Sequence, residues 1–299
     1  MNPHHDELHD DDIPVGRVVS RRELLKLFGG SGVALIFGAN MIRFGFDQQA
    51  TPNATQAVSC VVKPEMTEGP YFIGGALNRR DIRLDPSNDA VSAGIPLRLV
   101  FNVSALAASA CIPLENVQVD VWHCDADGVY SGVELGNAAT AENLFLRGYQ
   151  ATDALGNAEF ITIYPGWYPG RAVHIHFKLR TAEGYEFTSQ FFFDDALSDE
   201  IYTAAPYQTA RRSTLNRNDG IYSNGGDQMT LTLAPKTAAA LAEAYTETDP
   251  ELAERLLADG QDGYEALFAI ALDLSDTATG ASDGFSGGGR GNGGRPGRP

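Results

Sequence analysis

Two histidines stand one residue apart in the segment AVHIHFKLR, residues 172–180, and no other part of the chain is as well suited to chemistry. In an extended strand the side chains alternate between two faces, so His174 and His176 point the same way. Two imidazoles on one face can converge on a single metal ion. The alternative is a polar strand face whose histidines are satisfied by ordinary hydrogen bonds.

The number of histidines limits how a metal site could be completed. Three of the six lie in the N-terminal leader, at positions 4, 5 and 9, so only His123 remains besides the pair. A three-histidine zinc site would have to recruit His123. An iron(II) site with two histidines and one carboxylate stays open, although Glu183 and Glu186 lie past the end of the strand or in the next turn.

Tyrosine offers another kind of ligand close to the pair. Tyr168 precedes His174 by six residues, across the turn PGWYPGR, and Tyr130 lies in GVYSG just after the segment NVQVDVW. A phenol has an ordinary pKa of about 10, and binding to a trivalent ion supplies the energy to ionise it. The two tyrosines therefore favour iron(III), while the zinc and iron(II) alternatives stay open.

Short strands must position these side chains. Apolar residues alternate with a period of two at 95–103, 116–123, 158–164, 172–180, 187–194 and 229–234, and a last strand at 266–274 is expected to close the sheet. Helices are predicted at 237–247 and 250–258, the second with Pro250 in its first turn. This pattern predicts an all-β fold, an antiparallel β-sandwich core with short peripheral helices and long loops.

Composition narrows the class of protein. A chain of 299 residues with 43% hydrophobic and 20% charged residues suits one soluble domain with tails. The formal charge of −17 repels phosphate backbones and anionic lipids, so we expect no nucleic acid partner and no membrane surface partner. The three cysteines have no zinc-finger spacing, and a disulfide between Cys60 and Cys111 is left open.

The N-terminus resembles a twin-arginine export signal. Arg21 and Arg22 precede a glycine-interrupted apolar run at 27–39, which is shorter than the roughly 20 apolar residues of a membrane-spanning helix. The alternative is an amphipathic helix with an incidental arginine pair. Export would place the protein in the periplasm or outside the cell. We therefore expect three parts: a signal or leader at 1–50, the β-sandwich domain at 51–274, and a disordered Gly/Arg/Pro tail at 275–299.

Four separated motifs, taken in order, resemble the intradiol ring-cleavage dioxygenases, the family of catechol and protocatechuate dioxygenases. They are GVYSG after a VWH strand, TIYPGWYP, RAVHIHF and TSQFFFDD, and the matching segments run from about Glu68 to Asp195. The resemblance implies a β-sandwich that holds a non-haem iron(III), Fe(3+), between two tyrosinates, two histidines and a hydroxide. It also implies cleavage of a catechol-type ring by O2 between the two hydroxylated carbons, which gives a cis,cis-muconate-type product.

The resemblance assigns the ligands residue by residue. Tyr130 matches the axial tyrosinate, which the substrate displaces and which then accepts a proton. Tyr168 matches the tyrosinate that stays bound, and His174 and His176 match the two imidazole ligands. The segment EGPYF at 68–72 resembles one wall of the family's pocket.

Other positions match residues that are not ligands. Arg171 and Gln190 match those that line the substrate and steady its developing charge, whereas His123 matches a position outside the ligand set. For Arg171 the alternative is a salt bridge to a carboxylate, and for Gln190 a hydrogen bond within the sheet. The expected partners are a catechol-type molecule and O2, with a homodimer left open. Two other functions stay open, an iron(II) or zinc metalloenzyme and a secreted non-catalytic β-sandwich that binds carbohydrate or polyphenol.

Overall fold

The computed structural model describes residues 61–276, apart from 76, 108–109 and 136–137. The expected leader, Cys60 and nearly all of the expected tail lie outside the described residues. Cys111 is disulfide-bonded, and Cys124 is a buried free thiol. Within the described part of the chain, no helix has the length and apolar character needed to cross a bilayer.

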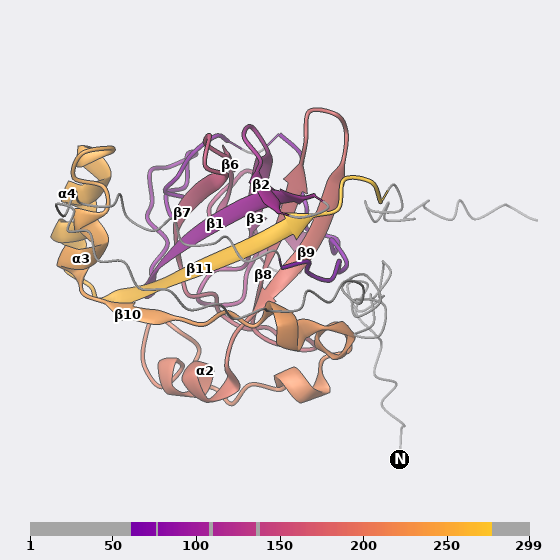
Figure 1. Ribbon diagram of the computed structural model, residues 1–299. Coiled ribbons are helices and arrows are strands. Elements are labelled where there is room, and N and C mark those ends of the chain that lie inside the picture. Colours follow the sequence, from indigo (N-terminus) through magenta and orange to yellow (C-terminus); the bar gives the residue numbers. More distant parts are fainter. Residues whose placement is uncertain (1–60, 76, 108–109, 136–137, 277–299) are drawn as a thin grey trace, which may run out of the picture.

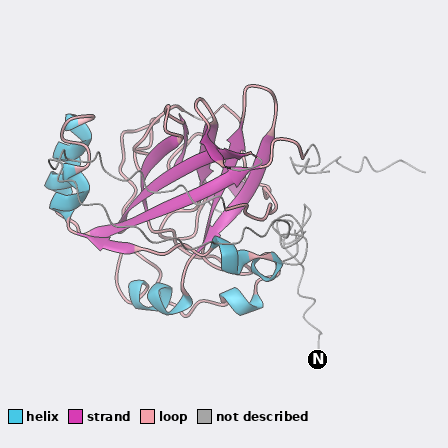
Figure 2. Ribbon diagram, viewed as in Figure 1, coloured by secondary structure: helices cyan, strands magenta, loops and turns pink. Residues whose placement is uncertain are grey.

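Two β-sheets form the body of the molecule, and helices are confined to its periphery (Figure 2). The larger, five-stranded sheet has the order β10-β11-β1-β2, with β7 also paired to β1; its strands are β1 (Pro96–Leu106), β2 (Cys111–Pro113), β7 (Asn157–Ile163), β10 (Ala234–Lys236) and β11 (Gly263–Leu272). The four-stranded sheet has the order β6-β3-β8-β9, formed by β6 (Arg147–Ala151), β3 (Gln118–Trp122), β8 (His174–Arg180) and β9 (Glu186–Phe192). A small ribbon pairs β4 (Glu134–Leu135) with β5 (Ala138–Ala139). The predicted all-β sandwich is confirmed.

The pairing of β1 with β11 departs from an antiparallel sandwich. The two strands run parallel, from Leu97 opposite Tyr264 to Ala105 opposite Leu272, and lie side by side in Figure 1. The strand expected at 266–274 is confirmed as the greater part of β11, which pairs with β1 along its length and with the short β10 only at Gly263–Glu265. Most residues of β11 are buried or half-buried, and Leu267 is its one exposed residue.

The core between the sheets is rich in phenylalanine. Phe177 of β8 stacks on Phe191 of β9 with ring centroids 4.5 Å apart, and Phe191 meets Phe268 of β11 at 4.6 Å. Since side chains alternate along a strand, the same register turns His174 and His176 to the outer face of the four-stranded sheet. Packing of the core therefore fixes the direction of the histidine pair.

Helices lie around the sandwich. Helix α2 (Asp195–Ile201) follows β9, whereas α3 (Ala238–Glu243) and α4 (Pro250–Asp259) lie together against Ile161 on the outer face of the larger sheet (Figure 1). The prediction of two helices near the C-terminal end is confirmed, with Pro250 in the first turn of α4. Short 3-10 turns fill the connection after α2: η2 (Asn216–Asn218), η3 (Tyr222–Asn224) and η4 (Gly226–Met229).

The strand predicted at 229–234 is wrong. Its first residue ends η4, and Thr230 makes only an isolated bridge to Phe192 before β10 begins at Ala234. Met229 and Leu231 are buried in the core cluster. The apolar residues of this segment therefore alternate because an irregular segment packs against the core. The segment does not form a ladder of strand hydrogen bonds.

Candidate metal and substrate site

Four side chains predicted as ligands come together on the outer face of the four-stranded sheet. Nε2 of His174 lies 3.1 Å from Nε2 of His176, 3.1 Å from the Tyr168 hydroxyl and 3.3 Å from the Tyr130 hydroxyl. The two histidines come from β8, Tyr168 from the turn before it, and Tyr130 from the loop after β3. The other three groups thus all approach the same atom, Nε2 of His174.

Two glycines allow the tyrosine-bearing turns to meet. Gly128 has φ of +80°, and a Cβ added there would lie 2.3 Å from the carbonyl oxygen of Trp167. A Cβ at Gly166 would lie 2.3 Å from the carbonyl oxygen of Asp125, whose carbonyl accepts a hydrogen bond from the Gly166 amide at 3.0 Å. Because neither position has room for a side chain, the turns pack backbone to backbone and bring Tyr130 close to Tyr168.

The protonation of the histidines suits metal binding. Nδ1 of His174 donates to the carbonyl oxygen of Ala172 at 2.7 Å, so Nε2 carries the lone pair. Burial, together with the positive charge of Arg171, holds the pKa of His176 well below its usual value, so this imidazole is neutral.

The donor set fits a hard trivalent cation. One lone pair on His174 accepts one good hydrogen bond, yet two phenols and a second imidazole approach it within 3.3 Å. Ligand atoms that each lie about 2 Å from one ion are roughly 3 Å apart when their bonds are at right angles, so this spacing fits a shared cation. Two phenol oxygens with two imidazole nitrogens are donors suited to iron(III).

Aromatic rings from the EGPYF segment line this constellation. Tyr71 stacks on Tyr130 with centroids 4.4 Å apart, and Phe72 packs against Trp122 at 4.9 Å. Trp122 in turn stacks on His176 at 5.0 Å. The segment that resembles a pocket wall in sequence therefore lies directly against the site. Trp122 is almost fully buried, so it serves as a packing residue and does not offer an exposed surface on which a substrate could stack.

A buried arginine supports the loop that carries Tyr130. The Arg147 guanidinium donates to the carbonyl oxygen of Ser131 at 2.7 Å and to that of Tyr71, and lies 5.8 Å from the Tyr130 ring centroid. Burial lowers the pKa of Arg147 to about 10, so it stays charged at neutral pH. Sequence reasoning missed this residue because it belongs to none of the four motifs.

Arg171 and Gln190 form one buried network with Asp219. The Arg171 guanidinium donates through Nε to Asp219 at 3.0 Å and through Nη2 to Gln190 at 2.5 Å, and its Nη1 lies 3.5 Å from Nε2 of His174. Gln190 also donates to the carbonyl oxygen of Thr67 at 2.9 Å. The salt bridge considered for Arg171 is present, and it coexists with a position beside the histidines. Nothing near Asp219 in sequence signals its place in this network.

His123 stands apart from the cluster. Its Nδ1 donates to the carbonyl oxygen of Cys124 at 2.8 Å, and its Nε2 accepts from the Thr162 hydroxyl at 2.6 Å. Both ring nitrogens are therefore engaged. Among the described residues, no group of three or more His, Cys, Asp or Glu side chains is placed to hold a metal ion. The described residues thus offer neither a three-histidine zinc site nor a two-histidine, one-carboxylate site.

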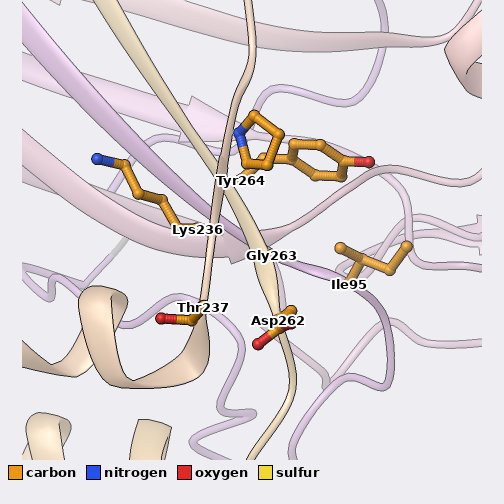
Figure 3. Close-up of a pocket in the computed structure, with 7 residues that line it drawn as sticks. Ile95, Lys236, Thr237, Asp262, Gly263 and Tyr264 are labelled. Carbon is orange, nitrogen blue, oxygen red and sulfur yellow. The ribbon is translucent and has the colours of Figure 1, made fainter.

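A separate hollow of about 280 Å³ lies beside β10 and the start of β11 (Figure 3). It contains none of the residues predicted for the site. Lys236 on its rim pairs with Glu265 at 3.0 Å, and Asp262 accepts a hydrogen bond from the Ala238 amide, also at 3.0 Å. These polar groups serve the fold, so we assign no function to this hollow.

The β-sandwich thus gathers two phenols and two imidazoles on one face of its four-stranded sheet. Residues 67–233, more than half of the chain, match the Dioxygenase_C family, described as dioxygenase. The chain belongs to this family.

Similar proteins agree with this placement. A protocatechuate 3,4-dioxygenase beta chain from Burkholderia cepacia is 33% identical over 147 residues, which cover 44% of this chain and 62% of that one. A chlorocatechol 1,2-dioxygenase from Pseudomonas putida is 28% identical over 150 residues, 42% of this chain and 52% of that one. The chain thus spans less than two thirds of these relatives. The solved structure of an intradiol ring-cleavage dioxygenase from Tetranychus urticae is similar with a TM-score of 0.52 and 26% identity, covering 72% of this chain and 95% of that one.

Proposed function

We propose that this protein is a non-haem iron(III) dioxygenase that cleaves a catechol-type ring between its two hydroxylated carbons. The observation that carries the proposal is the convergence of the Tyr130 and Tyr168 hydroxyls and the His176 imidazole on Nε2 of His174, all within 3.3 Å. The names of the similar proteins, which include protocatechuate and chlorocatechol dioxygenases, support the substrate class.

Tyr130, Tyr168, His174 and His176 would hold the iron. When bound, iron(III) supplies a Lewis acid that binds both catechol oxygens and makes the ring reactive toward O2. Tyr130 is the phenol whose ring is stacked on Tyr71 and braced by Arg147, so it has a defined place in the loop after β3. Its hydroxyl oxygen would accept one substrate proton as the catechol binds.

Arg171 would stabilise negative charge that builds on the ring. Its side chain is 1% exposed, and Nη1 lies 3.5 Å from Nε2 of His174, so the charge stands beside the reacting centre and away from water. Gln190 fixes the other end of the guanidinium through Nη2 and is itself held by Thr67. Its role is therefore to orient Arg171.

Iron loading tests the proposal directly. Purified protein loaded with ferric iron should be burgundy, through tyrosinate-to-iron charge transfer, and should show a high-spin iron(III) EPR signal. It should consume O2 on at least one member of a panel that runs from catechol, protocatechuate and hydroxyquinol to plant polyphenols, with a ring-opened muconate found by mass spectrometry. A colourless preparation that stays inert after loading would refute the proposal.

The same assays decide against the alternatives. An iron(II) or zinc enzyme built on the histidine pair would bind metal without the tyrosinate colour, and would be barely affected by Tyr168→Phe. A non-catalytic sandwich would bind a catechol or polyphenol and consume no O2. Both ring nitrogens of His123 are engaged in hydrogen bonds. Among the described residues, no third acidic or imidazole group lies at the histidine pair. Neither observation favours an iron(II) or a zinc site.

We further propose that the protein is exported by the twin-arginine route to the periplasm or beyond. Two observations support this: the Arg21-Arg22 pair before a short apolar run, and the disulfide at Cys111, since disulfides persist in oxidising compartments. Cell fractionation of the full chain, compared with a variant in which both arginines are lysine, tests it. Retention of the unaltered protein in the cytoplasm would contradict export.

A further inference from the structure

The carboxylate of Asp219 is held at four points in the interior. Oδ2 accepts from Nε of Arg171 at 3.0 Å and from the amide of Ala172 at 2.7 Å. Oδ1 accepts from the amide of Ile221 at 2.7 Å, just before η3, and from that of Tyr222 at 3.0 Å, the first residue of η3. Asp219 is 1% exposed, so the turn presents a fixed carboxylate to the segment just before β8.

Through these bonds Asp219 reaches two parts of the site. Asp219 accepts the hydrogen bond from Nε of Arg171. The two terminal nitrogens of the guanidinium then face other residues: Nη1 lies beside His174, and Nη2 donates to Gln190. Asp219 also fixes the amide of Ala172, whose carbonyl oxygen accepts the Nδ1 proton of His174 at 2.7 Å. The ring orientation of His174 and the direction of Arg171 therefore share one anchor, 48 residues further along the chain from Arg171.

We propose that Asp219 is a positioning residue for ring cleavage, which acts by holding Arg171 and the Ala172 peptide in register with His174. This inference rests on the proposed function. The pairing also explains why a buried arginine can stand next to neutral imidazoles, since Asp219 balances its charge. Asp219 touches no substrate; its effect passes through Arg171 and His174.

A second buried arginine provides a control for the loss of an ion pair. Arg212 is 6% exposed and donates to the partly exposed Asp195 at 2.9 Å and to Asp199 at 2.8 Å, in the same stretch of chain between β9 and β10. Asp195 also accepts from the Asn216 amide at 3.1 Å, so it too combines an arginine with a backbone contact. None of these bonds reaches a proposed ligand. Loss of an ion pair as such should therefore affect the two sites differently.

The first experiment compares Asp219→Asn with Asp195→Asn in the iron-loaded full chain. In Asp219→Asn we expect kcat on the best catechol to fall on the order of 100-fold, because an active-site misplacement of about 1 Å has that effect. Iron content should stay within about twofold, and the charge-transfer band should shift as His174 reorients. The folded Asp195→Asn protein should keep the kcat and the band of the unaltered protein. Equal kcat values and bands in both variants would overturn the proposal.

A double-variant cycle separates positioning from general destabilisation. Arg171→Gln alone, Asp219→Asn alone and the two together are compared for kcat and for anaerobic binding of 4-nitrocatechol, followed by absorbance. Because part of the effect of Asp219 passes through Arg171, adding Asp219→Asn to Arg171→Gln should lower kcat clearly less than Asp219→Asn lowers it in the unaltered protein, and the remaining loss reports the route through Ala172 and His174. Multiplication of the two single effects would refute the inference. The double variant contains no unpaired charge, so it keeps the test open if Asp219→Asn alone fails to fold.

The outcome also distinguishes the two levels of inference. If the unaltered, iron-loaded protein consumes no O2 on the whole panel, the proposed function fails and the positioning role fails with it. If that protein is active and Asp219→Asn matches it, only the role of Asp219 is lost.

Discussion

The indole of Trp122 lies almost flat against the imidazole of His176, with centroids 5.0 Å apart and an interplanar angle of 9°. The two residues are direct partners across the antiparallel β3–β8 pair. The stack fixes the plane of the imidazole, and with it the direction in which Nε2 faces His174.

Trp122→Leu should therefore weaken metal retention. The imidazole of His176 would lose its stacking partner, and loss of such a supporting contact lowers metal affinity by about 10-fold or more. Competition with a chelator, followed by iron analysis, measures the change. Trp122→Phe retains an aromatic ring and should recover most of the affinity. Equal iron affinity in the Leu variant would show that the stack contributes only to packing.

Tyr168→Phe should remove both colour and tight iron binding. Its hydroxyl lies 3.1 Å from Nε2 of His174, and phenylalanine keeps the ring while deleting the donor oxygen. Visible absorbance and iron content after loading report the result. The control is Tyr149→Phe, because Tyr149 is a half-buried tyrosine in β6. This variant should change neither the visible absorbance nor the iron content. If the Tyr168→Phe protein is burgundy and binds a full complement of iron, Tyr168 is not an iron ligand.

His123 should make the fold sensitive to acid. Burial lowers the pKa of His123 to about 4, against 6.5 for an exposed imidazole. Between these values the unfolded chain binds a proton that the folded chain does not, so the free energy of unfolding falls as the pH drops from 6.5 to 4. The pKa difference corresponds to about 3 kcal/mol.

Urea unfolding at pH 7, 5 and 4 measures this loss. Carboxylates also titrate in the range, so the comparison is with His123→Gln, which cannot gain the proton. The variant should be less stable than the unaltered protein at pH 7 and should lose less stability on acidification. Parallel pH profiles for the two proteins would contradict the assignment.

Phe177→Ala should destabilise the protein by about 3–5 kcal/mol, because it leaves a cavity where Phe177, Phe191 and Phe268 meet. Leu267→Ala is the matched control, since Leu267 is 72% exposed and its loss should change stability by about 0.5 kcal/mol or less. Thermal and denaturant unfolding measure both. Similar losses in the two variants would mean that this part of the core is loosely packed.

Much of the fold could be predicted from apolar alternation, but not all of it. The strands that contain Phe101 and Phe177 alternate because one face of each fills the core. Strand β6 was missed, since RGYQA does not alternate and Gly148 is needed where a Cβ would lie 2.6 Å from Ile82. The parallel partnership of β1 with β11 has no local signal, because it depends on the path of the chain through α3 and α4.

At the candidate site, too, some residues could be predicted from the sequence and others could not. Tyr130, Tyr168, His174 and His176 lie in motifs whose residue types and order reveal the donor set, and the structure brings them together. Arg147 and Asp219 carry no such signal, because what they do depends on backbone atoms of distant turns. Tertiary contacts of this kind become visible only when the coordinates are known.

The pairing of β11 with β1 has a consequence for synthesis. Until residues 263–272 leave the ribosome, β1 lacks the neighbour along one whole edge, and Phe101 has no Phe268 to pack against. The nascent chain therefore cannot complete its larger sheet early, and the sheet that carries the histidine pair lacks its full apolar support until then. Any step that requires the folded protein must therefore wait until residues 263–272 have been made.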